Sequence, residues 1–191
     1  MRRLLIGCSL AAVLCTGLWA AASAAAPANF AGTWTLDKTK SKDLPPQMDN
    51  IDSLMLTVTQ DAQQLTVDTK VARKETADAQ GGPPAGGPGG GRGRGMGMGL
   101  GMGTQTYKLD GSETSLDTGG RGTAITKAEW QNDGKTLKLT TKRSFNFNGN
   151  DVTLTNTEMW TLSGDGKTLT VQRTNESPRG TQTSTLVFNK Q

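Results

Sequence analysis

The pentapeptide Asp-Gly-Lys-Thr-Leu occurs twice in this chain, at residues 133–137 and again at residues 165–169. In both copies a tryptophan precedes the Asp-Gly pair, and a run of alternating apolar and polar residues follows it. An Asp-Gly pair between two alternating segments predicts a β-hairpin with a type I′ turn, in which both central residues have positive φ. The repeat therefore predicts a chain built from antiparallel hairpins.

The same alternation extends over most of the chain outside residues 81–103. One face of each expected strand is apolar, the other carries Thr, Lys, Gln and Ser, and no segment shows the apolar stripe of an amphipathic helix. This pattern predicts an all-β fold, an antiparallel up-and-down meander of about 8–10 strands closed into a barrel that leaves no free edges. The polar outer faces argue against a membrane-spanning barrel, because lipid-facing positions must be apolar.

Glycine and proline make up 16 of the 23 residues from 81 to 103. Such a segment buries too little apolar area to offset its ordering entropy. We therefore expect one long disordered loop, inserted in a hairpin of a single domain that spans residues 25–191. The loop also contains Met96, Met98 and Met102, whose soft thioether sulfurs could hold Cu(I), so copper binding is a distant alternative function.

The first 24 residues have the pattern of a secretory signal peptide. Arg2 and Arg3 precede an apolar stretch, and the small residues Ala-Ser-Ala at 22–24 favour cleavage after Ala24. We therefore expect a periplasmic or secreted protein whose signal peptide is removed.

Removal of the signal peptide would also remove both cysteines, Cys8 and Cys15, and the chain contains no histidine. The mature protein would then lack a thiolate, an imidazole base and the usual zinc ligands. This composition argues against an enzyme and predicts no catalytic residue, metal site or cofactor. The sequence shows no dense basic face, which argues against a nucleic-acid partner.

Charged residues on the expected inner face form the candidate binding site. If residues Asp165 and Gly166 centre their hairpin, Trp160 lies opposite Val171 and Glu158 lies opposite Arg173. A carboxylate and a guanidinium that point into a barrel must pair, because an unpaired buried charge is costly. The pair is either a polar group that orients the head of an amphipathic ligand or a structural pair that fixes the strand register.

The first expected strand reads Phe-Ala-Gly-Thr-Trp-Thr-Leu-Asp over residues 30–37. Its Gly32-Thr33-Trp34 sequence resembles the G-x-W first-strand motif of the lipocalin (calycin) superfamily. With the repeated hairpins, it is also similar to a group of small exported bacterial proteins of unassigned function. The resemblance implies a lipocalin-like barrel in which Trp34 plugs the closed end and Arg173 covers this tryptophan. The other lipocalin motifs and the usual C-terminal helix are not found in the sequence.

Fold, export and inner-face polarity together predict a lipocalin-like protein that binds a small hydrophobic or amphipathic molecule without catalysis. The residues expected to contact that ligand are Trp34, Arg143, Asn156, Glu158, Trp160 and Arg173. The alternative is a structural or interaction module of the bacterial envelope, whose barrel is filled by its own large side chains. A structure with room for no more than a few interior waters would remove the ligand-binding interpretation in favour of this alternative.

Overall fold

The computed structural model describes most of the expected barrel domain. The expected signal peptide, the three loop methionines and all of the expected loop except Gly103 lie outside the described residues. No helix in the described segments is long and apolar enough to span a membrane. The described segments are residues 26–74, 103–117, 122–132, 134–147 and 149–191.

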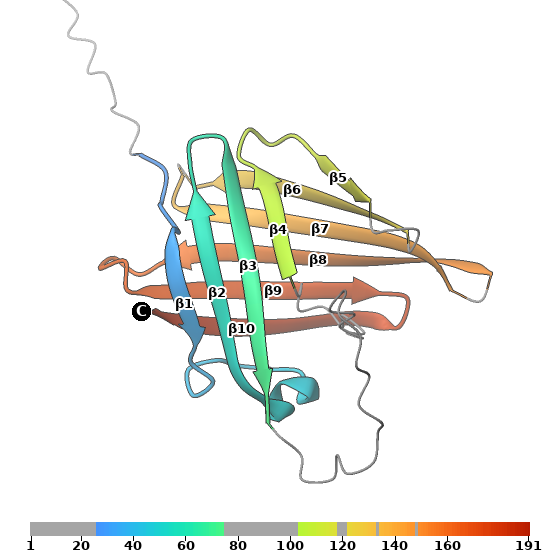
Figure 1. Ribbon diagram of the computed structural model, residues 1–191, viewed down its shortest axis with the longest axis horizontal. Coiled ribbons are helices and arrows are strands. Elements are labelled where there is room, and N and C mark those ends of the chain that lie inside the picture. The colour runs from blue at the N-terminus through green and yellow to red at the C-terminus, as the bar shows by residue number, and fades with distance from the viewer. Residues whose placement is uncertain (1–25, 75–102, 118–121, 133, 148) are drawn as a thin grey trace, which may run out of the picture.

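This part of the chain forms ten β-strands and one short 3-10 helix, and all strand pairs are antiparallel (Figure 1). The strands run in the sheet order β4-β3-β2-β1-β10-β9-β8-β7-β6-β5, so neighbours in the sheet are neighbours in the chain except where β1 meets β10. The expected all-β meander is confirmed. The elements are β1 (Gly32–Leu36), η1 (Pro46–Asn50), β2 (Ile51–Gln60), β3 (Gln64–Arg73), β4 (Gly103–Lys108), β5 (Thr114–Asp117), β6 (Thr123–Gln131), β7 (Thr136–Phe147), β8 (Asn150–Leu162), β9 (Thr168–Ser177) and β10 (Gly180–Lys190).

The sheet curls so that β1–β4 cross over β6–β10 (Figure 1), which leaves β4 and β5 at the two ends of the strand order. The seam between these ends is bridged by Thr126 of β6, whose side chain is fully buried. Its hydroxyl donates to the carbonyl oxygen of Thr106 in β4 at 2.9 Å, and the carbonyl oxygen of Thr114 in β5 lies 3.5 Å away. The barrel is therefore nearly closed.

The hairpin at residues 165–166 has the predicted register but not the predicted turn type. Gly166 has a φ of 68°, whereas Asp165 does not have positive φ, so the turn is not type I′. The amide of Gly166 donates to the carbonyl oxygen of Ser163 at 2.9 Å, and the Asp165 carboxylate accepts from the Ser163 hydroxyl at 2.6 Å. The aspartate side chain shapes a longer loop, in which Gly166 supplies the left-handed conformation. In the first copy Gly134 has a φ of 82°, and Asp133 lies outside the described residues.

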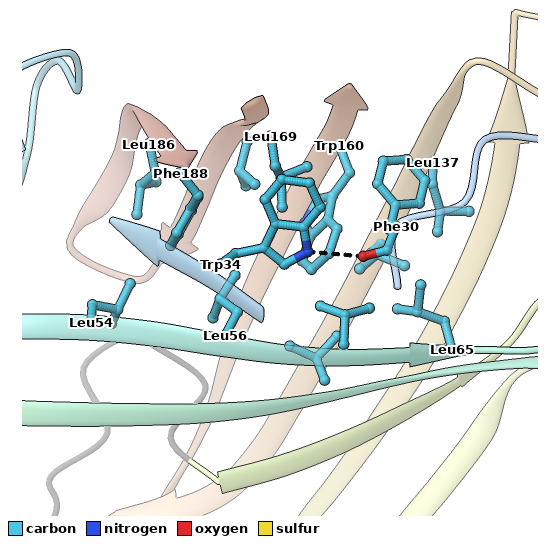
Figure 2. Packing of buried hydrophobic residues seen from close by; sticks show 14 of the residues in the cluster. Phe30, Trp34, Leu54, Leu56, Leu65, Leu137, Trp160, Leu169, Leu186 and Phe188 are labelled. Atoms are coloured by element: carbon cyan, nitrogen blue, oxygen red, sulfur yellow. Dashed lines mark hydrogen bonds between the residues drawn. The ribbon is translucent and has the colours of Figure 1, made fainter. Parts of the chain in front are cut away.

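Aromatic side chains fill one end of the barrel, which we call the sealed end (Phe30, Trp34, Trp130, Trp160 and Phe188). Phe30, Trp34 and Phe188 have no exposed surface. The Phe30 ring stacks against Trp130 at 6.1 Å between centroids and meets Trp160 edge-on at 5.7 Å. Figure 2 shows the rings of Phe30, Trp34, Trp160 and Phe188 packed among leucines from several strands. Offset and edge-on ring pairs of this kind are the favoured arrangements.

The strap formed by residues 26–31 closes the sealed end. The Ala28 amide donates to the carbonyl oxygen of Gly134 at 2.8 Å. The side-chain amide of Gln60 holds the strap twice, because it donates to the carbonyl oxygen of Ala28 at 3.0 Å and accepts from the Phe30 amide at 2.9 Å. The Trp34 indole nitrogen also donates to the carbonyl oxygen of Phe30 at 2.9 Å (Figure 2).

In the described structure, the cation over the Trp34 ring is Lys190, not Arg173 as the resemblance implied. The Lys190 ammonium lies 5.1 Å from the ring centroid, because Lys190 is directly opposite Trp34 in the β1–β10 pairing. A Cβ atom at Gly32 would lie 2.8 Å from Lys190 Cε, and Gly32 has a φ of 140°. The Gly-x-Trp sequence thus leaves space for the lysine side chain above the tryptophan.

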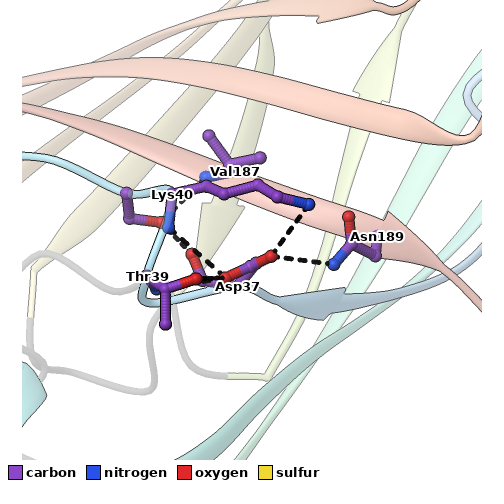
Figure 3. Close-up of polar contacts among 6 residues, drawn as sticks. Asp37, Thr39, Lys40, Val187 and Asn189 are labelled. Carbon is purple, nitrogen blue, oxygen red and sulfur yellow. Dashed lines mark hydrogen bonds and ion pairs between the residues drawn. The ribbon is translucent and has the colours of Figure 1, made fainter.

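The turn after β1 is organised by Asp37 (Figure 3). Its carboxylate accepts from the Thr39 amide and hydroxyl at 3.0 and 2.6 Å and from the Asn189 side-chain amide at 3.1 Å, and it pairs with the Lys40 ammonium at 3.1 Å. The hydrogen bond from Thr39, followed by those from Asn189 and Lys40, holds the pKa of Asp37 well below its usual range. This turn joins the end of β1 to β10.

Candidate functional site

Glu158 of β8 and Arg173 of β9 form the buried ion pair that the hairpin register predicts. The two residues are directly opposite each other in the β8–β9 pairing. Arg173 Nη2 lies 2.7 Å from Glu158 Oε1, and Nε donates to the same oxygen at 2.8 Å. The side chains are 8% and 14% exposed, so the pair is shielded from bulk water. Charge-assisted bonds of this length belong to the stronger class of protein hydrogen bonds.

The other carboxylate oxygen of Glu158 is also occupied. The indole nitrogen of Trp160 donates to Oε2 at 2.7 Å. Trp160 thereby connects the ion pair to the sealed end, where its ring meets Phe30. Three of the expected site residues, Glu158, Trp160 and Arg173, are thus in direct contact.

Three polar residues from β4 and β7 lie beside this pair. The Tyr107 hydroxyl donates to Gln105 Oε1 at 2.6 Å and lies 2.9 Å from the Thr141 hydroxyl. Burial, and then the negative charge of Glu158, raise the pKa of the Tyr107 phenol far above its usual value. Tyr107 therefore stays neutral, and its proton remains committed to Gln105.

The expected site residues did not include Tyr107, Gln105 or Thr141. The alternation contained the signal, since Gln105 is two residues before Tyr107 and Thr141 is two residues after the buried Leu139. A polar residue at an inward position of a strand has to find a partner. The mutual contact of Gln105 and Thr141 depends on β4 meeting β7 in the curled sheet, which the spacing in the sequence does not indicate.

The groups surround a small cavity in the middle of the barrel, with a volume of about 30 Å³. A water molecule needs roughly 10–15 Å³ by the same measure, so the cavity holds about two waters. Typical sites for drug-sized ligands measure about 300–1,000 Å³. The enclosed space therefore admits a single small chemical group. It is lined by Leu56, Val67, Thr69, Gln105, Tyr107, Leu139, Glu158, Trp160, Val171, Arg173 and Phe188.

Two lining residues have hydrogen-bond donors to spare. The bonds of Gln105 in the structure use its oxygen, and those of Arg173 use Nε and Nη2. Within the described segments, Gln105 Nε2 and Arg173 Nη1 have no acceptor. The cavity thus offers donors around an ion pair whose charges cancel.

Beyond the cavity the inner face becomes more polar, in a region that we call the open end (Arg143, Phe145, Leu154, Asn156 and Asn175). These side chains are half-buried. The Asn156 side-chain amide donates to Asn175 Oδ1 at 2.7 Å, and Arg143 has no ion-pair partner in the described part of the chain. Asn156 and Arg143, both expected site residues, therefore lie further along the inner face and do not line the cavity.

Trp34, the remaining expected site residue, belongs to the sealed end. It is fully buried beneath Lys190 and is not among the side chains that line the cavity. The fold and the site together define a nearly closed antiparallel β-barrel with an aromatic base and a polar centre. This description fits a lipocalin-like architecture only coarsely.

Comparison with known proteins gives one distant likeness. No family model matches the chain, and no curated protein matches it. A crystal structure of zebrafish ileal bile acid-binding protein complexed with cholic acid is similar to 85% of this chain and 98% of its own, with 13% sequence identity and a TM-score of 0.44. A likeness this distant says nothing about the binding site.

Proposed function

We propose that this chain is an exported, non-catalytic binding protein for a small amphipathic molecule, whose polar end enters the cavity beside Glu158 and Arg173. The observation that carries the proposal is the presence of unused donors, on Gln105 and Arg173, at a small cavity inside the barrel. Small-molecule sites typically have a small number of polar groups that point toward one place in mostly apolar surroundings.

A purely structural role accounts for only part of this arrangement. An ion pair that fixes strand register needs its two partners alone, and Glu158 and Arg173 already satisfy each other. Gln105 and Tyr107 of β4 and Thr141 of β7 add further polar groups at the same place, on strands outside the β8–β9 hairpin. These groups leave donors at the cavity without a protein acceptor among the described residues, and a ligand that supplies an acceptor would bond to them.

The cavity volume restricts where the ligand lies. At about 30 Å³ the enclosed space takes the polar end only. The rest of the molecule would extend along the open end, where Leu154 and Phe145 of the inner face are half-buried. The Arg143 guanidinium lies on the same face. Apolar contacts there would supply most of the affinity.

A second candidate is a filled-barrel module that binds other envelope components. The cavity has room for about two waters, which is the condition given above for preferring this module, so the binding proposal depends on a ligand that lies mostly outside the cavity. At the sealed end of the described structure, the packed side chains stabilise the fold and leave no space for a ligand. The outer face offers a row of directly opposed threonines across four strands, a regular polar surface suited to contacts with another molecule. This row consists of Thr140, Thr157, Thr174 and Thr183.

Native mass spectrometry of the protein purified from its own host distinguishes the two candidates. A binding protein should carry a small molecule of reproducible mass, and the variant Gln105→Leu should lose much of it. Repeated spectra at the bare mass of the chain would instead favour the module. The same spectra test export, because a mature chain should begin near Ala25 and fractionate with periplasmic or secreted proteins.

A further inference from the structure

We propose that the cavity selects a neutral hydrogen-bond acceptor, the carbonyl oxygen of an amide, ketone or ester, and rejects a carboxylate. This inference rests on the proposed binding function and specifies the chemical class of the ligand's inner end. It follows from the charges and the unused donors around the cavity.

The positive charge of Arg173 is already compensated. Its guanidinium contacts Glu158 Oε1 at 2.7 and 2.8 Å, and the pair is almost completely buried. A ligand carboxylate in the cavity would place a second negative charge beside Glu158, and the two like charges would repel each other. To avoid this repulsion, Glu158 would have to leave both Arg173 and its 2.7 Å hydrogen bond from Trp160.

A carbonyl oxygen suits the remaining donors. Gln105 and Arg173 line the cavity, and Gln105 Nε2 and Arg173 Nη1 have accessible surface and no acceptor among the described residues. A carbonyl oxygen has two lone pairs and no charge, so it can accept from both donors without disturbing the ion pair. Tyr107 does not compete, because its hydroxyl proton is given to Gln105 Oε1.

Arg143 is another cation on the inner face, and its charge also acts on Tyr107, more weakly than that of Glu158 does. It is half-buried and does not line the cavity. Arg143 therefore attracts anions to the open end, but it does not change the compensation of the Arg173 charge by Glu158 at the cavity. Measurements at physiological salt reduce this longer-range attraction, which separates the two effects.

The test compares two probes of equal chain length, decanamide and decanoate, at neutral pH and physiological salt. Their affinities are measured by displacement of the neutral fluorophore N-phenyl-1-naphthylamine. Decanamide should bind on the order of tenfold more tightly than decanoate. In Glu158→Gln the negative charge is removed and Arg173 becomes available, so decanoate should gain affinity until it equals or exceeds decanamide.

A second variant leaves the ion pair intact. Gln105→Leu removes one donor and should weaken decanamide binding about fivefold to tenfold, with decanoate little affected. Gln172→Leu, at an exposed position on the outer face of β9, is the matched control and should change neither affinity. If Glu158→Gln fails to fold, the contrast between Gln105→Leu and Gln172→Leu decides the question.

The possible outcomes distinguish a failure of the proposed carbonyl selectivity from a failure of the proposed binding function. Decanoate binding as tightly as decanamide to the unmodified protein, or equal losses of both probes in Gln105→Leu, would overturn the selection for a neutral acceptor while leaving a binding protein. Failure of both probes and of the fluorophore to bind would overturn the binding function itself, and the inference with it.

Discussion

The two ends of this barrel are built from the same alternating strands, but the side chains that face inward differ between them. At the sealed end, Phe30 and Trp34 are fully buried, and Phe30 belongs to the strap of residues 26–31, which Gln60 holds in place. At the open end, Arg143 and Asn156 occupy inward positions of the same sheet and stay half-buried. The cavity with Glu158 and Arg173 lies between the two. Stability is therefore concentrated at one end, which leaves the other free to carry polar groups.

Truncating one phenylalanine at each end tests most clearly whether the two ends differ in packing. Phe30→Ala should lower the free energy of unfolding by about 3–5 kcal/mol, because it empties a fully packed site between two tryptophans. Phe145→Ala at the half-buried open end should cost roughly 1–2 kcal/mol, since less apolar area is lost. Urea unfolding of both variants measures the contrast. Equal losses would show that the ends do not differ in packing.

The ion pair between the ends should give the next largest effect. Glu158→Gln leaves the Arg173 charge buried without a counter-charge, which should cost roughly 3 kcal/mol. Thr157→Ala, the adjacent residue on the outer face of β8, is the control and should cost less than about 1 kcal/mol. Thermal and urea unfolding both report the difference. A Glu158→Gln protein as stable as its parent would mean that the pair is not buried as described.

The strap gives a smaller and more local effect. Gln60→Ala removes two hydrogen bonds to the strap and should cost about 1–2 kcal/mol. Amide hydrogen exchange of Phe30 should accelerate in this variant, while exchange in β8 and β9 should stay unchanged. Gln182→Ala, at an exposed position of β10, should alter neither quantity. If Phe30 exchange did not change, the Gln60 side chain would not be what holds the strap.

The smallest expected effect lies in the turn after β1 and depends on pH. Hydrogen bonds hold the pKa of Asp37 below its ordinary value of 3.8, so the ionised carboxylate stabilises the fold above that pH. Asp37→Asn should be less stable than the parent at neutral pH, and the gap should shrink as the pH falls below 3.8 and the parent carboxylate is protonated. Urea unfolding at several pH values checks this. A gap that is constant with pH would mean that the lost stability does not come from the charge.

The fold was largely predictable because alternation and turn residues are local signals. The Asp165-Gly166 pair predicted the correct opposition of Glu158 and Arg173 even though its turn type was wrong, because the alternation of inward residues on β8 and β9 also specifies the register. The charged part of the site followed from that register.

The other parts of the site depend on contacts that sequence spacing does not encode. Gln105 and Thr141 meet only because the curled sheet brings β4 against β7. The Lys190 ammonium reaches Trp34 because β10 closes onto β1, a pairing between the two ends of the domain. The size of the cavity likewise depends on how many side chains pack together, so it could not be predicted from the list of inward positions.

The account's central claim is that ligand reaches the cavity from the open end while the sealed end stays shut. Hydrogen–deuterium exchange of the protein with and without decanamide tests it most directly. We predict slower exchange in β4 around Gln105 and in β8 and β9 around Glu158 and Arg173, with the strap of residues 26–31 unchanged. Protection confined to the strap, or no change at any of these strands under conditions where decanamide binds, would contradict the claim.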